Sequence, residues 1–448
     1  MGFGSSWARR SVLAAAVAVL AIGVVRAQDV RPVPVEQGGT AAAHPLRPMF
    51  DQFVQTIENR FAKPERLAAL GWKAKAEAAW PGIAAAKTAA EAAPALNALL
   101  RPLETSHTQV FTPDDVEFYI IADVFGLKGV LPEIWSGPPM LPGIGVFTAK
   151  FDGRDHVTHV LEGSPADKAG IKTGDEIVSV DGRPYSPVAP FRAKAGKTSV
   201  LEIRRTRDGD RKRVEVPVVL MQPTEALDQA ARNSARVIER GGKRIGYVHL
   251  WQMRSEDLLG WILASIDSTR RSTTRRQTVR FYAPGQADKA DSPLDALIID
   301  NRTKIGGQSG IGEHYLETLS GNRGGVIQST DRRSDKTPKK VAKSFAGRSA
   351  MLIDGGTRSA AELFAFGYAH EKMGPLVGTT TAGAVTAANA RMLPGGLLIY
   401  FGVADVTIDG QTLEGKGVEP TIRVDRPIPY SDGADPQLEA AVRFLSGD

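Results

Sequence analysis

A serine at the start of a helix is the main candidate for chemistry in this sequence. Residues Ala350–Asp354 predict a strand, two glycines follow, and a helix is expected from about Ser359 to near Gly374. Unpaired N–H groups and the positive dipole end of a helix N-terminus favour developing negative charge. Ser359 could therefore be a nucleophile beside an oxyanion hole, or a simple N-cap serine.

Two adjacent glycines follow another predicted strand. Residues Leu294–Asp300 have the pattern of a buried strand, and the loop after it contains Gly306 and Gly307. Glycines at such a point allow backbone N–H groups to approach a ligand closely. The pattern by itself does not identify the ligand.

The elements that must position these residues fall into three regions after the N-terminal 27 residues. Residues 28–141 predict a tether and then short packed helices, which Pro81 and Pro94 divide. Residues 142–222 change to short strands with tight turns. Residues 223–448 alternate strands and helices, which predicts an α/β domain; within them, residues 267–291 are a polar, arginine-bearing stretch that we expect to be a surface insertion.

The middle region resembles a PDZ domain. Its most recognisable pieces are Ser164-Pro165-Ala166, Lys172-x-Gly-Asp and Ile177-x-x-Val-Asp-Gly. Such a domain adds an extended peptide as a strand and holds the terminal carboxylate on loop N–H groups. The expected peptide-binding loop here consists of Gly143, Ile144, Gly145 and Val146. Alternatively, the module packs against its neighbours as a regulatory lid.

The order of motifs resembles the C-terminal processing and tricorn-like serine peptidases, nearly from end to end of the mature chain. The shared pieces are Ser106-His107-Thr108, the PDZ segment, Ile245-Gly246-Tyr247, the loop 300–307, Ser359-Ala360-Ala361-Glu362, Val377-Gly378 and Gly415–Pro420. This resemblance implies a ClpP/crotonase-type α/β fold with Ser359 as the nucleophile. It also implies an oxyanion hole made by the N–H of Ala360 and that of Gly306 or Gly307.

The sequence departs from the serine-lysine members of this family at the general base. Those members have a lysine directly after Thr-x-Gly, whereas Ala384 follows Thr381-Ala382-Gly383 here. The tricorn-like branch has a histidine on the strand that begins Gly-Tyr-Val, and His249 stands at that place. The resemblance also implies that Glu414 joins the site as the orienting carboxylate of a triad.

Other residues could also serve as the general base. Lys304 and Lys416 are alternatives, although a lysine must be desolvated to lose its proton near neutral pH. His107 could be catalytic, but we favour a structural role for it in its loop. His370 lies eleven residues after Ser359 on one predicted helix, roughly 16 Å away, which is too far for direct proton transfer.

The N-terminus has the anatomy of a secretory signal peptide. Arg9 and Arg10 precede the apolar run Ser11–Val25, and Ala27 completes a small-x-small cleavage pattern. The run is shorter than the ~20 residues of a membrane-spanning helix. We therefore expect cleavage after Ala27 and a periplasmic or secreted protein without a stable membrane span.

Composition narrows the possible partners. The 448 residues contain no cysteine and carry a net charge of +6, of which the first 27 residues supply three positive charges. So small an excess does not indicate nucleic acid binding, and no sequence pattern indicates a metal site or a cofactor. We expect an exported serine endopeptidase acting on unfolded or tail-presented proteins, with homo-oligomerisation left open; the alternative is an inactive, peptide-binding adaptor.

Overall fold

The computed structural model describes residues 44–127, 137–266, 293–302, 305–308, 310–320, 322–323, 339–340, 345, 347–408 and 410–448. The expected signal peptide with its cleavage after Ala27, the tether up to residue 43, the insertion 267–291 and Lys304 lie outside the described residues. Within the described part of the chain, no helix combines the length and apolar character that a membrane span requires.

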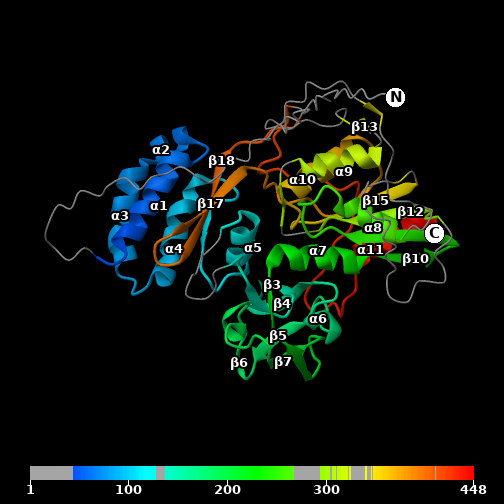
Figure 1. Ribbon diagram of the computed structural model, residues 1–448, viewed down its shortest axis with the longest axis horizontal. Helices are drawn as coiled ribbons and strands as arrows, with labels where there is room; N and C mark the ends of the chain where they lie inside the picture. Colours follow the sequence, from blue (N-terminus) through cyan, green and yellow to red (C-terminus); the bar gives the residue numbers. More distant parts are fainter. Residues whose placement is uncertain are drawn as a thin grey trace, which may run out of the picture. The chain divides into compact units, whose positions relative to one another are not determined.

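Short helices open the described chain, as predicted (Figure 1): α1 (Arg47–Arg60), α2 (Pro64–Leu70), α3 (Trp72–Ala84), α4 (Ala89–Leu100) and α5 (Val116–Val124). The expected division by proline is wrong, because Pro81 and Pro94 lie inside α3 and α4. The breaks instead fall at Gly71, which adopts a left-handed conformation, and at Thr88, whose side chain caps α4 by accepting from the Glu91 N–H.

A small antiparallel sheet joins this helical region to a distant part of the sequence. Its strand order is β1 (Gln109–Phe111), β18 (Leu397–Ala404) and β17 (Ala387–Leu393). Buried side chains of α1 and α4 share one apolar core with Leu397, Ile399 and Phe401 of β18. The hairpin β17–β18 therefore packs with the N-terminal helices. Because β1 pairs with β18, the residues just before β1 lie beside the C-terminal half of the chain.

The PDZ region contains a six-stranded sheet. Five of its strands lie in the order β3 (Val146–Phe151), β4 (Arg154–Val160), β5 (Glu176–Val180), β7 (Thr198–Arg204) and β8 (Arg211–Pro217), and the short strand β6 (Arg183–Pro184) also pairs with β5. The short strands β2 (Leu141–Gly143) and β9 (Val219–Met221) pair where the region begins and ends. The helix α6 (Pro165–Lys168) starts at Ser164, whose side chain accepts from the Asp167 N–H. The region encloses an apolar core of its own.

A six-stranded sheet forms the centre of the C-terminal region. In order across the sheet its strands are β10 (Arg236–Arg240), β11 (Lys243–His249), β12 (Ala296–Asp300), β15 (Arg348–Ile353), β16 (Leu376–Gly378) and β19 (Ile422–Arg423). All neighbouring pairs are parallel except β10 with β11. The remaining helices are α7 (Pro223–Ser234), α8 (Leu258–Ile266), α9 (Ile311–Ser320), α10 (Ala360–His370) and α11 (Pro436–Ser446), and β13 (Asn322–Arg323) pairs with β14 (Lys339–Lys340).

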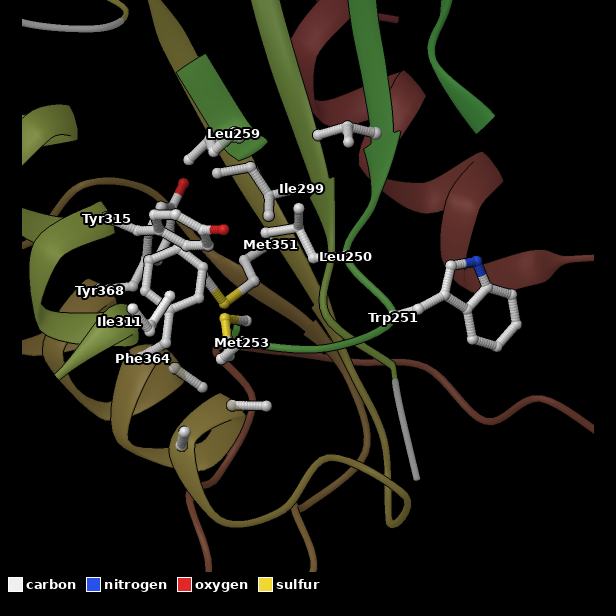
Figure 2. Close-up of a cluster of buried hydrophobic side chains, with 14 of the residues drawn as sticks. Leu250, Trp251, Met253, Leu259, Ile299, Ile311, Tyr315, Met351, Phe364 and Tyr368 are labelled. Atoms are coloured by element: carbon white, nitrogen blue, oxygen red, sulfur yellow. The ribbon is translucent and has the colours of Figure 1, made fainter. Parts of the chain in front are cut away.

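The two faces of this sheet bury alternate residues of each strand. Ile298 and Leu352 face a core that includes apolar residues of α11. Ile299 and Met351, one position along, lie in the larger cluster with residues of α8, α9 and α10 (Figure 2). Helices on both faces of a parallel sheet are the arrangement expected for the predicted α/β domain. Because β12 and β15 run in parallel, both deliver the loops that follow them to one edge of the sheet.

Candidate active site

Ser359 is held in a strained conformation at the start of α10. Its φ is 56° and its ψ is −131°, a region that costs a non-glycine residue roughly 1–3 kcal/mol. The side chain makes no capping hydrogen bond, and the backbone N–H donates to the Ala384 carbonyl at 2.7 Å. The hydroxyl is thus not used as an N-cap, which favours the nucleophile over the simple capping role.

One of the predicted oxyanion-hole residues, Gly306, lies directly against this serine. A Cβ at Gly306 would come within 2.3 Å of Ser359 Cβ and 2.8 Å of Ser359 Oγ, so only glycine allows this approach. The Gly306 carbonyl accepts from the Met253 N–H at 2.9 Å, which fixes the loop. Gly307 is packed against Met253, because a Cβ at Gly307 would come within 2.0 Å of the Met253 carbonyl oxygen. Ala360 is the first residue of α10, where the N–H has no acceptor inside the helix.

A buried glutamate fixes the loop in which the lysine is missing. Glu362, on α10, accepts hydrogen bonds from the Thr381 hydroxyl and from the N–H groups of Gly383 (2.6 Å) and Ala384 (2.8 Å). Burial is the largest influence on this carboxyl and raises its pKa, although the three donors oppose the shift. Since Ala384 also accepts the Ser359 N–H, Glu362 positions the nucleophile through this loop.

Glu414 lies beside the same loop and faces the segment before β1. Its carboxylate accepts from the N–H groups of Val385 (2.8 Å) and Thr386 (3.0 Å). It also accepts from the Ser106 N–H at 2.8 Å and from the Ser106 hydroxyl at 3.0 Å. These donors outweigh burial and lower its pKa. Glu414 is therefore an ionised group that ties the Ser359 loop to residues 106–107.

His107 completes a hydrogen-bonded row with Ser106 and Glu414. Its Nδ1 lies 2.8 Å from Ser106 Oγ. A serine hydroxyl has one proton, and here it is directed to the carboxylate. Ser106 Oγ must then accept from His107 Nδ1–H, and this assignment of the tautomer leaves the lone pair on Nε2. A neutral imidazole with a free Nε2 is the form that a general base requires.

The surroundings of His107 keep it neutral. Burial lowers its pKa from 6.5 to about 4, with a further lowering by the Arg358 guanidinium and an opposing effect of Glu414. The ring packs edge-on against Tyr400 of β18, with centroids 5.3 Å apart. Like Ser359, His107 has a positive φ, 55°. The sequence favours a structural role for His107, and its described hydrogen bond connects it through Ser106 to Glu414.

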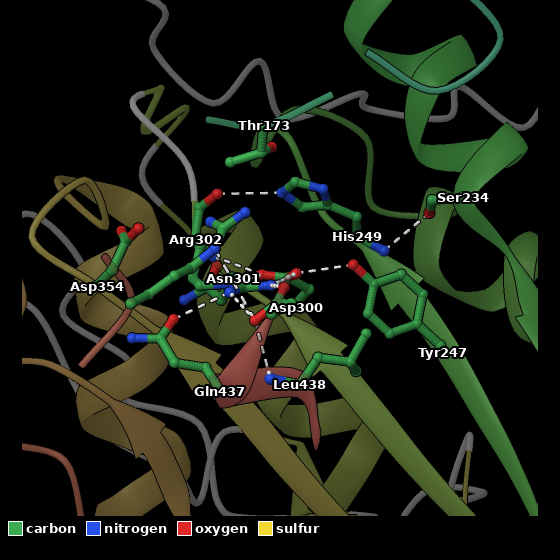
Figure 3. Close-up of polar contacts among 12 residues, drawn as sticks. Thr173, Ser234, Tyr247, His249, Asp300, Asn301, Arg302, Asp354, Gln437 and Leu438 are labelled. Atoms are coloured by element: carbon green, nitrogen blue, oxygen red, sulfur yellow. Dashed lines mark hydrogen bonds and ion pairs between the residues drawn. The ribbon is translucent and has the colours of Figure 1, made fainter. Parts of the chain in front are cut away.

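His249 stands at the end of β11 in a different environment. Its Nε2 lies 3.0 Å from the Arg302 carbonyl oxygen (Figure 3), and its Nδ1 lies 3.2 Å from a carboxylate oxygen of Glu162 in the PDZ region. The ring stacks on Trp251 with a centroid distance of 3.8 Å. The other Glu162 oxygen accepts from the Trp251 indole N–H at 2.7 Å.

Both ring nitrogens of His249 face acceptors, so both contacts are hydrogen bonds only in the imidazolium form. In agreement, Asp300 and Glu162 outweigh the lowering effect of burial and raise the pKa of His249. An imidazolium has no lone pair to take a proton. The expected pairing with Glu414 is also absent from the described contacts of His249, because the Glu414 oxygens bond Ser106, Val385 and Thr386. The geometry therefore does not support His249 as the base.

A buried ion cluster anchors the start of the glycine loop (Figure 3). Arg302 donates to Asp300 at 2.6 and 2.9 Å and to Asp435, at the start of α11, at 2.7 and 2.9 Å. Tyr247 donates to Asp300 at 2.7 Å. Although burial opposes ionisation, Arg302 holds the pKa of Asp300 well below its usual range. The loop that leads to Gly306 therefore begins at a fixed point.

Two carbonyl groups of the predicted peptide-binding loop accept hydrogen bonds from within the PDZ region. Ile144 O accepts from Ala166 N–H and Gly145 O accepts from Leu161 N–H, both at 2.9 Å. Gly145 has a φ of 87°, and a Cβ there would come within 2.3 Å of the Ser164 side chain. Val146 begins β3, which ends the described strand order of its sheet. An outer strand beside such a loop is the arrangement that peptide addition requires.

Two family models match separate segments of the chain. Residues 244–424 match the family model of peptidase family S41, and residues 156–191 match that of the PDZ domain. The chain carries an S41 peptidase domain. The prediction of a C-terminal processing or tricorn-like serine peptidase with a PDZ module is thus confirmed at the level of the family and the fold. No group of three or more metal-binding side chains occurs among the residues that the structure describes.

Relatives of this chain carry both names implied by the motifs. Carboxy-terminal processing protease CtpA of Bacillus subtilis is 26% identical over 318 residues, which cover 68% of this chain and 60% of the relative. The tricorn protease homolog 2 of Streptomyces coelicolor is 26% identical over 418 residues, covering 89% of this chain but 32% of the relative. The chain therefore spans less than two thirds of the length of both relatives.

Proposed function

We propose that this chain is a serine endopeptidase in which His107, rather than His249, is the general base. The observation that carries the proposal is the row from Glu414 through the Ser106 hydroxyl to His107 Nδ1, which leaves Nε2 free. The same carboxylate accepts from residues 385 and 386, next to the carbonyl that holds the Ser359 N–H. Nucleophile, base and carboxylate are then parts of one connected unit.

In the proposed reaction His107 Nε2 takes the proton of Ser359 Oγ as this oxygen attacks the scissile carbonyl carbon. The carbonyl π bond breaks, and the resulting oxyanion accepts from the N–H of Ala360 and from that of Gly306 or Gly307. The imidazolium then returns the proton to the leaving amine, and the C–N bond breaks. Water repeats the sequence on the acyl-enzyme and releases Ser359.

Glu414 acts through Ser106 in this scheme. The carboxylate keeps the Ser106 proton directed toward itself, and the Ser106 oxygen therefore stays an acceptor for His107 Nδ1–H. When His107 is protonated, the nearby negative charge stabilises the imidazolium, consistent with the Glu414 effect on its pKa. The role resembles that of the orienting carboxylate of a triad, with one hydroxyl inserted.

We further propose that substrates are unfolded or tail-presented proteins, and that the chain works outside the cytosol after signal cleavage at Ala27. The loop Gly143–Val146 would hold a terminal carboxylate while β3 receives the peptide as a strand. Phe147 of β3 stacks on Trp251, with centroids 5.9 Å apart, so a bound peptide would lie next to a residue of the S41 domain.

The test is hydrolysis of a reduced, unfolded protein by the mature chain and by Ser359→Ala. The proposal expects turnover that this substitution abolishes. If the wild type hydrolyses nothing, and the wild type and Ser359→Ala bind carboxyl-terminal peptides equally well, the result would support the alternative, an adaptor without activity.

A further inference from the structure

Arg358, the residue immediately before the nucleophile, is an unusual cation in this site. Its side chain is partly buried, and its one described hydrogen bond runs from Nε to the Gly356 carbonyl at a long 3.4 Å. No carboxylate of the described residues lies within ion-pair distance of the guanidinium. Both terminal nitrogens are therefore left to solvent or to a ligand.

Another arginine of the same domain shows what a satisfied guanidinium looks like here. Arg302 is buried and donates to both Asp300 and Asp435, as a fixed fork of donors normally does with carboxylates. Arg358 has the same donor set and a partly buried position without such partners.

The carboxylates close to the catalytic residues are not available to Arg358. Glu414 is saturated by Ser106, Val385 and Thr386, and Glu362 accepts from residues 381, 383 and 384. The positive charge of Arg358 is therefore not neutralised by either acid of the site.

The charge of Arg358 affects two neighbouring aromatic side chains, Tyr400 and His107. Burial raises the pKa of Tyr400, and Arg358 opposes that rise; it also adds to the lowering of the His107 pKa. Since Tyr400 packs against the His107 ring, the guanidinium lies close enough to influence both of these neighbouring rings.

We propose that Arg358 is a specificity-determining residue that binds a carboxylate of the substrate close to the scissile bond. This inference rests on the proposed peptidase function. An Asp or Glu side chain and the α-carboxylate of a short C-terminal product have the same chemistry, which suits the planar fork of arginine. Pairing would neutralise a charge that the protein leaves uncompensated.

The experiment measures kcat/KM for matched peptides that differ at single positions on either side of the cleaved bond. One arm exchanges Glu for Gln within the chain, and the other compares a free carboxyl terminus with its amide. Wild type should prefer the carboxylate by about 10- to 100-fold at one position, the range for hydrogen bonds to a charged group. The arm that responds identifies the source of the carboxylate.

Substitutions at Arg358 make the comparison specific. Arg358→Gln should remove the preference, Arg358→Lys should retain part of it, and Arg358→Glu should favour Lys-containing peptides. Arg423→Gln, at an exposed arginine of β19, serves as the matched control and should keep the wild-type preference. Labelling of Ser359 by a serine-directed phosphonate shows that each variant is folded.

The outcomes separate the two proposals. If wild type cleaves all peptides and shows no preference in either arm, or if Arg358→Gln keeps the preference, Arg358 does not select the substrate although the peptidase function stands. If wild type cleaves neither these peptides nor an unfolded protein, the peptidase proposal fails and this inference fails with it.

Discussion

Two histidines of this molecule each lie beside a glutamate, and their hydrogen bonds give them opposite properties. At His249, both ring nitrogens face acceptors, Glu162 and the Arg302 carbonyl, and the pKa of the ring is raised, so its protonated form is favoured. At His107, a hydroxyl separates the ring from Glu414, and one nitrogen stays free. The difference teaches that donor and acceptor counts, not proximity to a carboxylate, decide which imidazole can act as a base.

The largest expected effect distinguishes the histidines by turnover. His107→Ala should lower kcat/KM for an unfolded protein by about 10²- to 10⁴-fold, the usual contribution of a general base. His249→Gln, which keeps an amide NH₂ group that can donate to at least one of the two acceptors, should stay within about tenfold of wild type because it removes no reacting group. Steady-state kinetics of both variants checks this, and the reverse order of effects would restore His249 as the base.

The connection through Ser106 should give a smaller loss. Ser106→Ala and Glu414→Gln each remove part of the row that fixes the His107 tautomer, so each should lower kcat by about 10- to 100-fold, the equivalent of one hydrogen bond to a charged group. If the row acts as a unit, the double variant should lose little more than either single variant. Additive losses would show that the two residues act separately.

The pH dependence of kcat/KM should reflect the low pKa of His107. A base that is neutral above about pH 4 should keep kcat/KM level down to that region. The base first expected, His249, has a raised pKa and would give a fall at or above 6.5. Rates measured from pH 4 to 9, with folding followed by near-UV circular dichroism, decide between these values.

The smallest effect concerns stability and belongs to His249. Because its pKa is raised in the folded state, protonation of His249 favours folding below its unfolded pKa, and this contribution disappears as the pH rises through the folded value. The difference in Tm between wild type and His249→Gln should therefore be larger at pH 6 than at pH 9. Trp251→Phe, which removes the indole donor to Glu162 and shortens the ring stacked on His249 but keeps the titrating imidazole, provides a control that should not reproduce this pH dependence. A constant difference in Tm would contradict the imidazolium assignment.

The sequence predicted the fold and the place of Ser359 at the start of a helix, because both depend on local patterns. The strand, glycines and helix around Ser359, the paired glycines 306 and 307 and the PDZ turns are each readable within about fifteen residues. The central sheet then brings the ends of β12 and β15 together, as parallel pairing requires.

The general base that we propose, His107, could not be chosen in the same way. His107 and Glu414 are connected across more than 300 residues of sequence, through a pairing of β1 with β18 that local periodicity does not reveal. The motif Ser106-His107-Thr108 was visible in the sequence. Whether His107 can act as a base depends on the direction of the Ser106 hydroxyl proton, and that direction depends on tertiary structure. His249 was chosen by its place on a strand, and its partner Glu162 lies in the PDZ region, which the motif did not include.

The most direct test of this account is the rate at which a serine-directed phosphonate labels Ser359 in His107→Ala and in His249→Gln, because labelling measures activation of the hydroxyl without substrate selection. The account predicts that labelling at pH 7 is nearly lost in His107→Ala and close to wild type in His249→Gln. Fast labelling of His107→Ala together with loss in His249→Gln would contradict it.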